Sequence, residues 1–271
     1  TFRPCGYCIG CRLENSRQWA MRCVHEAQMH EENCFITLTF NDKNLPSDKS
    51  VNKKTLQKFM KDLRKELYPK KIRFFGCGEY GEKLKRPHYH VALFGHDFPD
   101  KEIIFMEPKK SGSRPTARNN ILHNSKALRE IWKKGFVTVG NLTFESAGYV
   151  ARYVTKKING EKYEKHYKGK NQEFALMSRN KGIGYEWIKK YWNDVYPKDF
   201  VTIRGKKMRP CKYYDTYMEK TYPEMFKEIK LKRIEQEEKS DEESGENWRN
   251  YEKYKHRKLI TKTLDRKFER S

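Results

Sequence analysis

The pattern of apolar and polar positions predicts a chain that alternates strands and helices. Residues 34–40, CFITLTF, combine aromatic and β-branched side chains before a polar, turn-rich stretch, which predicts a buried strand. From Asn52 onward the apolar positions recur at helical spacing instead, which predicts an amphipathic helix that ends before Pro69. Its apolar face consists of Leu56, Phe59, Met60, Leu63 and Leu67.

Further elements follow along the chain. Strands are predicted within residues 70–83, 86–98 and 135–144, and helices at 122–134, 145–158 and 184–195. The second of these strands begins near Pro87, where a missing backbone donor costs least. Residues 107–120 read as a basic loop, and Ser146 is the predicted cap of the helix at 145–158.

The order of these elements, β-α-β-β-α-β-α, predicts an α+β fold with an antiparallel sheet and helices packed against it. We divide the chain into four segments on this basis. They are a cysteine-bearing segment packed on the core at 1–33, the sheet-bearing domain at 34–160, a basic, tyrosine-rich extension at 161–223, and a charged tail at 224–271 that is helical or partly disordered.

The charge balance predicts a polyanionic partner. The chain has 59 Lys and Arg against 36 Asp and Glu, a net charge of +23. Residues 224–271 hold 14 basic and 12 acidic residues, so nearly all of the excess belongs to the first 223 residues rather than to a basic tail. We therefore expect nucleic acid as the partner.

Composition also bears on the compartment. No run of about 18 apolar residues exists in the sequence, so we expect no transmembrane helix, and no secretory signal opens the printed chain. Because the chain begins at Thr1 rather than at methionine, we expect residues to precede it in the natural protein. Seven cysteines, an odd number, favour a reducing cytoplasm over a disulfide framework.

A candidate metal site lies at the head of the strand that begins at Pro87. His88 and His90 are two residues apart, so both side chains project from the same face of a strand. The preceding strand ends near Glu79, and antiparallel pairing brings it to the same end of the sheet. Two imidazoles and one carboxylate suit a divalent cation with open coordination positions. Glu82, in the hairpin, competes with Glu79 as the third ligand.

A candidate nucleophile lies on the helix at 145–158. Its apolar stripe consists of Ala147, Val150, Ala151 and Val154. Tyr149, Tyr153 and Lys156 fall on the opposite side of the helix, with the two tyrosines one turn apart. A phenol beside a cation can act as a nucleophile, because the cation favours the phenolate.

The first segment contains a cysteine cluster with three open interpretations. Cys5, Cys8 and Cys11 occur at three-residue intervals, and either Cys23 or His25 could complete a tetrahedral zinc site. Reduced free thiols and redox chemistry are the alternatives, since no second pair of ligands follows.

Three motifs in order resemble the HUH-type rolling-circle replication initiators, which cleave and rejoin single-stranded DNA. They are the apolar strand FITLTF, the sequence HYH preceded by Glu79, and the spacing Y-x-x-x-Y-x-x-K of Tyr149, Tyr153 and Lys156. The stretches GEYGEKLKRPHYH and RPCGYCIGCRLENSRQWAMRC are most similar to the initiators of the Microviridae, gokushovirus branch. The resemblance covers about residues 1–160 and extends to roughly 215.

The resemblance implies a fold and a chemistry. It implies that residues 34–160 form an HUH endonuclease domain, a ferredoxin-like or RRM-like sheet of about five strands, with a mostly helical C-terminal region. It also implies Mg²⁺ or Mn²⁺ at the two histidines and an acidic ligand. A tyrosine would attack the scissile phosphate, leaving a 5′-phosphotyrosine and a free 3′-OH, and the second tyrosine would serve a second cleavage.

The same reading predicts the partners. We expect single-stranded DNA at a replication origin, in the cytoplasm of a bacterial host cell, with a host DNA polymerase extending the 3′ end. The sequence lacks an ATP-binding loop, so we expect a host helicase to unwind the duplex. Predicted phosphate contacts are Arg73, Lys83, Lys85, Arg86 and Arg152, and Tyr80 and Tyr89 are candidates for stacking on unpaired bases.

Two other classes of function fit part of these observations. A plasmid relaxase or initiator, or a single-strand transposase, would use the same chemistry in another role, often with one working tyrosine. A non-catalytic single-stranded DNA-binding protein would explain the charge and the tyrosines. It would not explain why Glu79, His88 and His90 converge beside a seam of two tyrosines and a lysine.

Overall fold

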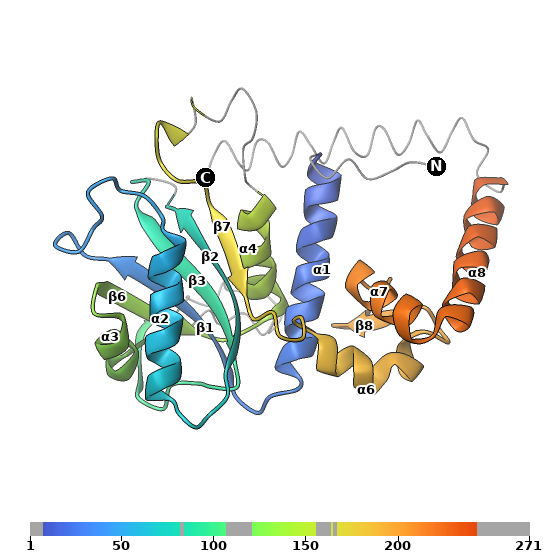
Figure 1. Cartoon of the computed structure of the whole chain (residues 1–271), viewed down its shortest axis with the longest axis horizontal. Coiled ribbons are helices and arrows are strands. Elements are labelled where there is room, and N and C mark those ends of the chain that lie inside the picture. Colours follow the sequence, from blue (N-terminus) through green and yellow to red (C-terminus); the bar gives the residue numbers. More distant parts are fainter. Residues whose placement is uncertain (1–7, 82–83, 107–120, 156–163, 165–166, 243–271) are drawn as a thin grey trace, which may run out of the picture. The chain divides into compact units, whose positions relative to one another are not determined.

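The computed structural model describes residues 8–81, 84–106, 121–155, 164 and 167–242, and Figure 1 shows their helices and strands. The chain divides into two compact units. One comprises residues 15–187, and the other comprises residues 1–14 together with 188–271. None of the described helices combines the length and apolar character that crossing a membrane requires.

The unit of residues 15–187 is built on an antiparallel sheet. Its seven strands lie in the order β4-β5-β6-β1-β3-β2-β7, and every neighbouring pair runs antiparallel. They are β1 (Asn33–Phe40), β2 (Arg73–Tyr80), β3 (Pro87–Phe94), β4 (Lys101–Met106), β5 (Ile121–Ser125), β6 (Gly135–Gly140) and β7 (Phe174–Met177). The predicted α+β class is confirmed, and the sheet has more than the expected five strands.

The additional strands lie toward the two edges of the sheet. The predicted helix at 122–134 is wrong in its first turn, because Ile121–Ser125 forms β5 and only Lys126–Trp132 forms helix α3. Ser125 ends the strand and caps the helix, with its hydroxyl accepting from the amide of Leu128 at 3.0 Å. Strands β4 and β7 had no counterpart among the predicted elements. β7 has only four residues, too few for a pattern to emerge.

One face of the sheet packs against α2 (Lys53–Glu66) and α3. Asn52 caps α2 by accepting a hydrogen bond from the amide of Lys54 at 2.8 Å. The predicted apolar face is confirmed, since Leu56, Phe59, Met60 and Leu63 are buried and Leu67 packs at the edge of the same core. Their partners on the sheet include Ile36, Leu38, Tyr89, Val91 and Leu93.

The opposite face packs against α1 (Ile9–Ala27) and α4 (Phe144–Thr155), which lie near each other in Figure 1. The buried side chains here are Ala20, Cys23, Phe75, Cys77, Ala92, Phe94, Ala147, Val150 and Ala151. Small residues bring the two helices together, because a Cβ built on Gly148 would lie 3.6 Å from that of Ala20. The hydroxyl of Ser16 also donates to the carbonyl of Gly148 at 2.9 Å.

The cap of α4 differs from the prediction by three residues. Thr143 is the capping residue, because its hydroxyl accepts from the amide of Ser146 at 3.1 Å. Ser146 reciprocates, its hydroxyl accepting from the amide of Thr143 at 2.8 Å. Such an exchange satisfies two otherwise unpaired amides at the helix start, so Ser146 supports the cap instead of providing it.

The second unit is mostly helical. It contains β8 (Val201–Ile203), β9 (Lys206–Met208), α7 (Lys212–Thr221) and α8 (Pro223–Glu242), and the predicted helix at 184–195 is present as α6 (Tyr185–Val195). The guanidinium of Arg233 on α8 donates to Asp199 at 2.7 Å and to Asp215 on α7 at 2.9 Å. The start of the predicted tail is therefore a packed helix, and residues 243–271 lie outside the described residues. The four-segment division of the chain stays a prediction.

Candidate metal centre

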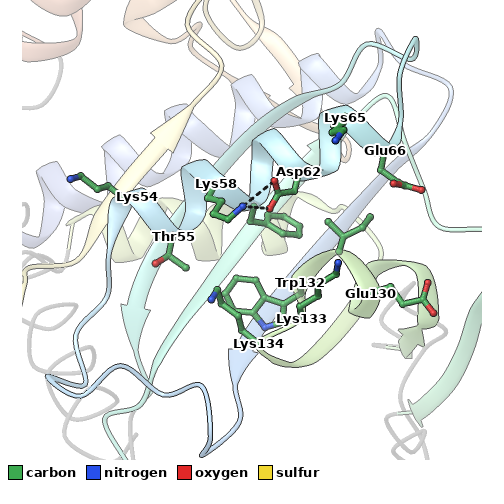
Figure 2. Close-up of a pocket in the computed structure, with 12 residues that line it drawn as sticks. Lys54, Thr55, Lys58, Asp62, Lys65, Glu66, Glu130, Trp132, Lys133 and Lys134 are labelled. Atoms are coloured by element: carbon green, nitrogen blue, oxygen red, sulfur yellow. Dashed lines mark hydrogen bonds and ion pairs between the residues drawn. The ribbon is translucent and has the colours of Figure 1, made fainter.

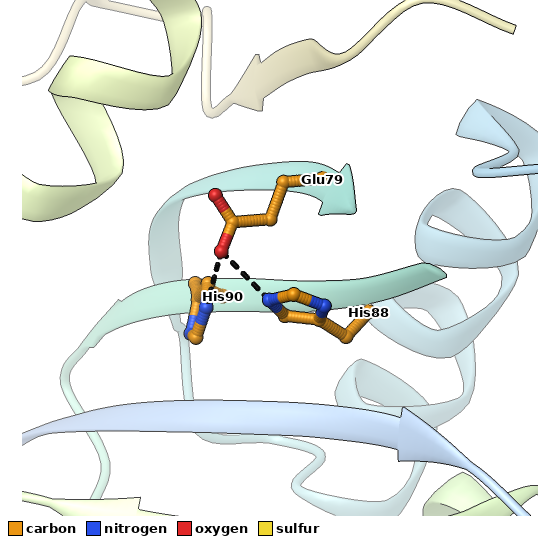
Figure 3. Close-up of side chains that lie close together, drawn as sticks. All are labelled: Glu79, His88 and His90. Carbon is orange, nitrogen blue, oxygen red and sulfur yellow. Dashed lines mark hydrogen bonds and ion pairs between the residues drawn. The ribbon is translucent and has the colours of Figure 1, made fainter. Parts of the chain in front are cut away.

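The register between β2 and β3 brings three potential metal ligands together. Glu79 on β2 is directly opposite His88 on β3, and Cys77 is opposite His90. Directly opposed residues of an antiparallel pair share a face, so all three ligand side chains project toward α1 and α4. Figure 3 shows the carboxylate of Glu79 reaching across to both imidazoles. The convergence expected from the hairpin is thus present, and Glu82 lies outside the described residues.

Both imidazoles contact the same carboxylate oxygen. Oε1 of Glu79 lies 2.7 Å from Nε2 of His88 and 2.9 Å from Nε2 of His90. The three residues form a group whose candidate ligand atoms all lie within 4.8 Å of one another. Glu79 is 1% exposed and His90 is 7% exposed, whereas His88 is half-buried. The site therefore opens to solvent on the side of His88.

The second nitrogen of each imidazole is held from behind. Nδ1 of His88 lies 3.2 Å from the carbonyl oxygen of Arg86, which can only accept, so Nδ1 carries the proton. Nδ1 of His90 lies 2.9 Å from the hydroxyl of Thr37 on β1. Outer partners of this kind fix the ring orientation of metal-binding histidines. Sequence reasoning missed Thr37, although the alternation in residues 34–40 puts it on the face of the sheet that carries Phe35 and Thr39.

Burial and hydrogen bonding set the charge states. Burial acts to raise the pKa of Glu79, but the hydrogen bonds from His88 and His90 outweigh it and hold that pKa below its usual range. Burial lowers the pKa of His90, and the nearby carboxylate only partly offsets this. A carboxylate and a neutral imidazole are the forms that bind metal ions.

The residues fit a divalent cation. Oε2 of Glu79 is buried without a hydrogen-bond partner among the residues that the structure describes. A buried carboxylate oxygen left unpaired is costly, and a bound cation would satisfy it. One carboxylate and two imidazoles are donors that Mn²⁺ and related divalent ions accept while keeping positions open for substrate.

The helix α4 brings a tyrosine to this group. Ala147, Val150 and Ala151 are fully buried, as the predicted stripe requires. Tyr149 lies off the stripe, and its ring centroid is 5.2 Å from that of His90, with the rings perpendicular. Tyr153 is one helical turn further along α4, but its side chain and that of Val154 are outside the description, and Lys156 lies outside the described residues.

The predicted phosphate contacts separate into different environments. Arg73 is at the far end of β2, six residues or about 20 Å from Glu79. It pairs with Glu26 at 2.5 Å and donates to the carbonyl of Lys181 at 2.7 Å, so its assignment to DNA is corrected to a role within the fold. Arg86 adjoins His88 and pairs with the exposed Asp42 at 2.7 Å.

The other three predicted cations are less constrained by the structure. Lys85 is exposed in the turn between β2 and β3, with a left-handed backbone. Lys83 lies outside the described residues, and Arg152 belongs to α4 with its side chain not described. The contacts of these residues with DNA stay predictions.

The proposed stacking role of Tyr89 is wrong. Its side chain is fully buried on the α2 face of the sheet, and its ring packs edge-on against Trp132 with centroids 5.8 Å apart. Its hydroxyl accepts from the amide of Asn52 at 3.2 Å. Alternation sends the middle residue of HYH into the core, since its two neighbours face the other way. Tyr80 is half-buried, and its hydroxyl donates to the carbonyl of Asn171 at 2.7 Å.

The cysteine cluster is only partly described. Cys5 lies outside the described residues. Cys23 is fully buried among apolar side chains, where burial raises the pKa of its thiol, so its assignment as a zinc ligand is corrected to a core residue. The alternative ligand His25 is buried and stacked on Trp187 with ring centroids 3.6 Å apart. Within the described part of the chain, Glu79, His88 and His90 form the single group suited to a metal.

A groove of about 640 Å³ lies on the other side of the sheet, between α2 and the segment from Glu130 to Lys134 (Figure 2). Charged side chains line it, and Lys58 pairs with Asp62 across 3.0 Å. The groove contains no histidine or cysteine and belongs to the α2 face, away from Glu79. It therefore offers none of the chemistry that the metal centre offers.

Comparisons with known proteins agree on one family. The family model for replication-associated proteins of the ORF2 type matches residues 33–158. The chain is 31% identical over 244 residues to replication-associated protein VP4 of Bdellovibrio phage phiMH2K, covering 84% of this chain and 71% of that protein. It is 33% identical over 235 residues to replication-associated protein ORF2 of Spiroplasma virus 4, covering 82% and 69%. No solved structure gives a significant match.

Proposed function

This chain belongs to the family of replication-associated proteins found in phages of the Microviridae, and from that premise we propose that it is a metal-dependent endonuclease that nicks and rejoins single-stranded origin DNA. The proposal goes beyond the names of its relatives, which state an association with replication and no reaction. It also assigns a use to each residue of the centre around Glu79.

The observation that carries the proposal is the position of Tyr149 beside the group of Glu79, His88 and His90. A phenol 5.2 Å, ring to ring, from a candidate metal ligand is well placed to reach a phosphate bound at the same centre. Glu79 and the two histidines would hold Mg²⁺ or Mn²⁺, which when bound would polarise the phosphate and offset its charge. A sheet built only to bind DNA would have no use for this convergence.

The reaction assigned to Tyr149 is a transfer of the phosphoryl group. Its phenol oxygen forms a bond to the scissile phosphorus, while the bond from phosphorus to the 3′ oxygen breaks. The phenol proton is lost to solvent or a nearby base, and the departing 3′ oxygen gains a proton. The products are a 5′-phosphotyrosine on the protein and a free 3′-OH, from which a host polymerase can extend the strand.

Two tyrosines suit a reaction that must occur twice. While one tyrosine holds the first 5′ end, the other can cleave the regenerated origin after one round of synthesis. The new 3′-OH then attacks the first phosphotyrosine, which restores the phenol and closes a circle. We assign these roles to Tyr149 and Tyr153, with Lys156 favouring the phenolate.

The proposal is tested by trapping the covalent adduct on a denaturing gel. Wild-type protein with single-stranded DNA of the cognate phage origin and Mn²⁺ should give a shifted band. The variants Tyr149→Phe and Tyr153→Phe are compared with the double variant and with His88→Ala. The expected result is loss of the adduct in the double variant and in His88→Ala, with the single variants assigning the order of cleavage.

The opposite result would reassign the protein. Salt-sensitive binding of the origin strand without any adduct from the wild type would leave a non-catalytic DNA-binding protein. A plasmid relaxase or a transposase of the same chemistry would form the adduct on a different DNA sequence. Replacing the phage origin by unrelated single strands of equal length controls for that alternative.

A further inference from the structure

A large aromatic side chain is exposed on the same face of the sheet as the metal centre. Phe136 on β6 is 67% exposed, although β6 is an interior strand with β5 on one side and β1 on the other. Its neighbours in sequence behave differently, since Val137 is buried on the α2 face. A phenylalanine in an interior strand normally lies under a helix or a second sheet, so its exposure needs a reason.

The strand register connects Phe136 to the metal centre. Phe136 is directly opposite Thr39 on β1, Thr39 is opposite His88 on β3, and His88 is opposite Glu79 on β2. Side chains at directly opposed positions project from the same face. Phe136, Thr39, His88 and Glu79 therefore form one row across four adjacent strands. We call this row the transverse row.

The spacing of strands gives the scale of the row. Adjacent strands lie about 4.8 Å apart, so the backbones at Phe136 and His88 are separated by roughly 10 Å. A stacked DNA strand advances roughly 3.4 Å per nucleotide, so this distance corresponds to a few nucleotides. A strand whose phosphate lies at His88 and Glu79 can therefore place a nearby base over the ring of Phe136.

We propose that Phe136 is a stacking platform for one unpaired base of the DNA strand that the metal centre cleaves. The proposal rests on the proposed function and adds a base-binding subsite to it. Aromatic side chains stack on any base, because every base presents a π face. Phosphates on either side of that base would be attracted by the basic excess of the first 223 residues.

The surroundings favour a base over a protein partner. The side chain beside Phe136 along the transverse row is Thr39, and the next on the same face of β6 is Thr138, both small, polar and half-buried. A stable protein interface needs about 1,000 Å² or more with an apolar centre. A single exposed ring between threonines falls well short of that, but it matches the size of one base.

The test separates contacts to the base from contacts to phosphate. The protein used is the full chain carrying Tyr149→Phe and Tyr153→Phe, with Mn²⁺ present, so that the DNA stays uncut. Binding of fluorescent oligothymidylate is compared with binding of an abasic oligonucleotide of equal length at one salt concentration. The variants added to this background are Phe136→Ala, Phe136→Trp and, as a matched control, Tyr68→Ala, which removes an aromatic ring that is 83% exposed.

The expected result is specific to stacking. Phe136→Ala should weaken binding of oligothymidylate at least about fivefold and leave binding of the abasic strand unchanged. Phe136→Trp should restore the affinity, and Tyr68→Ala should change neither affinity. The dependence of the binding constant on salt should keep its slope in every variant, because no phosphate contact is removed.

Two results would overturn the proposal. Equal affinity of Phe136→Ala and its parent for oligothymidylate would exclude a stacking role, and equal weakening toward both strands would indicate a change in the fold. Because binding needs neither catalytic tyrosine, it can be measured whether or not the wild type forms a covalent adduct. A failure of the subsite is thereby distinguished from a failure of the endonuclease proposal.

Discussion

The hydroxyl of Thr37 on β1 lies 2.9 Å from Nδ1 of His90 on β3. The two residues are directly opposite each other in the strand pair, so the contact follows from the register. With Nδ1 donating to this hydroxyl, the lone pair of Nε2 is directed toward Glu79, where a metal ion would bind. Thr37 is thus a positioning residue that fixes the tautomer and orientation of a ligand.

Thr37→Val should therefore weaken metal binding while leaving the strand intact. Valine has nearly the shape of threonine and suits a strand, so the change removes the hydrogen bond and little else. The affinity for Mn²⁺, measured by calorimetry, should fall about tenfold. Thr138→Val is the matched control, because Thr138 is opposite Thr37 on β6 and also half-buried. Equal Mn²⁺ affinities of the two variants would show that the hydroxyl does not matter.

Glu79→Gln should abolish the response of the fold to metal. A ligand that binds only the folded state at 100 times its dissociation constant adds about 2.7 kcal/mol to the free energy of unfolding. The neutral amide of glutamine cannot balance the charge of Mn²⁺, so the variant should gain little. Urea denaturation with and without Mn²⁺ measures both gains, and Glu130→Gln, in the groove on the opposite face, serves as control. An undiminished gain in Glu79→Gln would remove Glu79 from the site.

The sequence was sufficient to predict the centre of the sheet and the metal ligands. A period of two places His88 and His90 on one face, and a short hairpin returns the chain beside Glu79, so both inferences depend only on local geometry. The edge strands lacked such a signal. Strand β4 exposes three consecutive apolar residues, Ile103 to Phe105, so it shows no alternation between a buried and an exposed face.

The misassigned residues share a different cause. Arg73 was grouped with the active-site motifs by its position in the sequence, but six residues along a strand span about 20 Å. Tyr89 was read as a surface aromatic, although the period that puts both histidines on one face sends the residue between them into the core. Thr37 was missed because a threonine in a strand has no feature that distinguishes a hydrogen-bonding role from ordinary strand preference.

The corrected position of Tyr89 gives a prediction that separates folding from DNA binding. Tyr89→Phe keeps the buried ring but leaves the amide and carbonyl of Asn52, at the cap of α2, without the hydroxyl that contacts both. The free energy of unfolding should fall by about 1–3 kcal/mol. Affinity for single-stranded DNA should stay unchanged, as it should for Tyr68→Phe at the surface. A loss of DNA affinity without a loss of stability would restore the stacking role.

The ion pair between Glu26 and Arg73 should make stability depend on pH. Burial acts to raise the pKa of Glu26, but hydrogen bonds from His30 and from the amide of Gly184, together with the charge of Arg73, outweigh it and hold the pKa below its usual range. Folding therefore favours the charged carboxylate. The resulting stability is fully present above the pKa of glutamate in the unfolded chain, about 4.3, and is lost as pH falls through the folded value.

Glu26→Gln should accordingly destabilise the protein at pH 7 by about 1–3 kcal/mol, because Arg73 loses its charged partner while remaining only partly exposed. The difference between variant and wild type should shrink as the pH falls below 4, where the wild-type carboxylate also becomes neutral. Urea denaturation across this range measures it, with Glu66→Gln on α2 as the control for a carboxylate at the surface. A difference that stays constant from pH 7 to the acid limit would mean that Glu26 acts through packing and hydrogen bonding rather than through its charge.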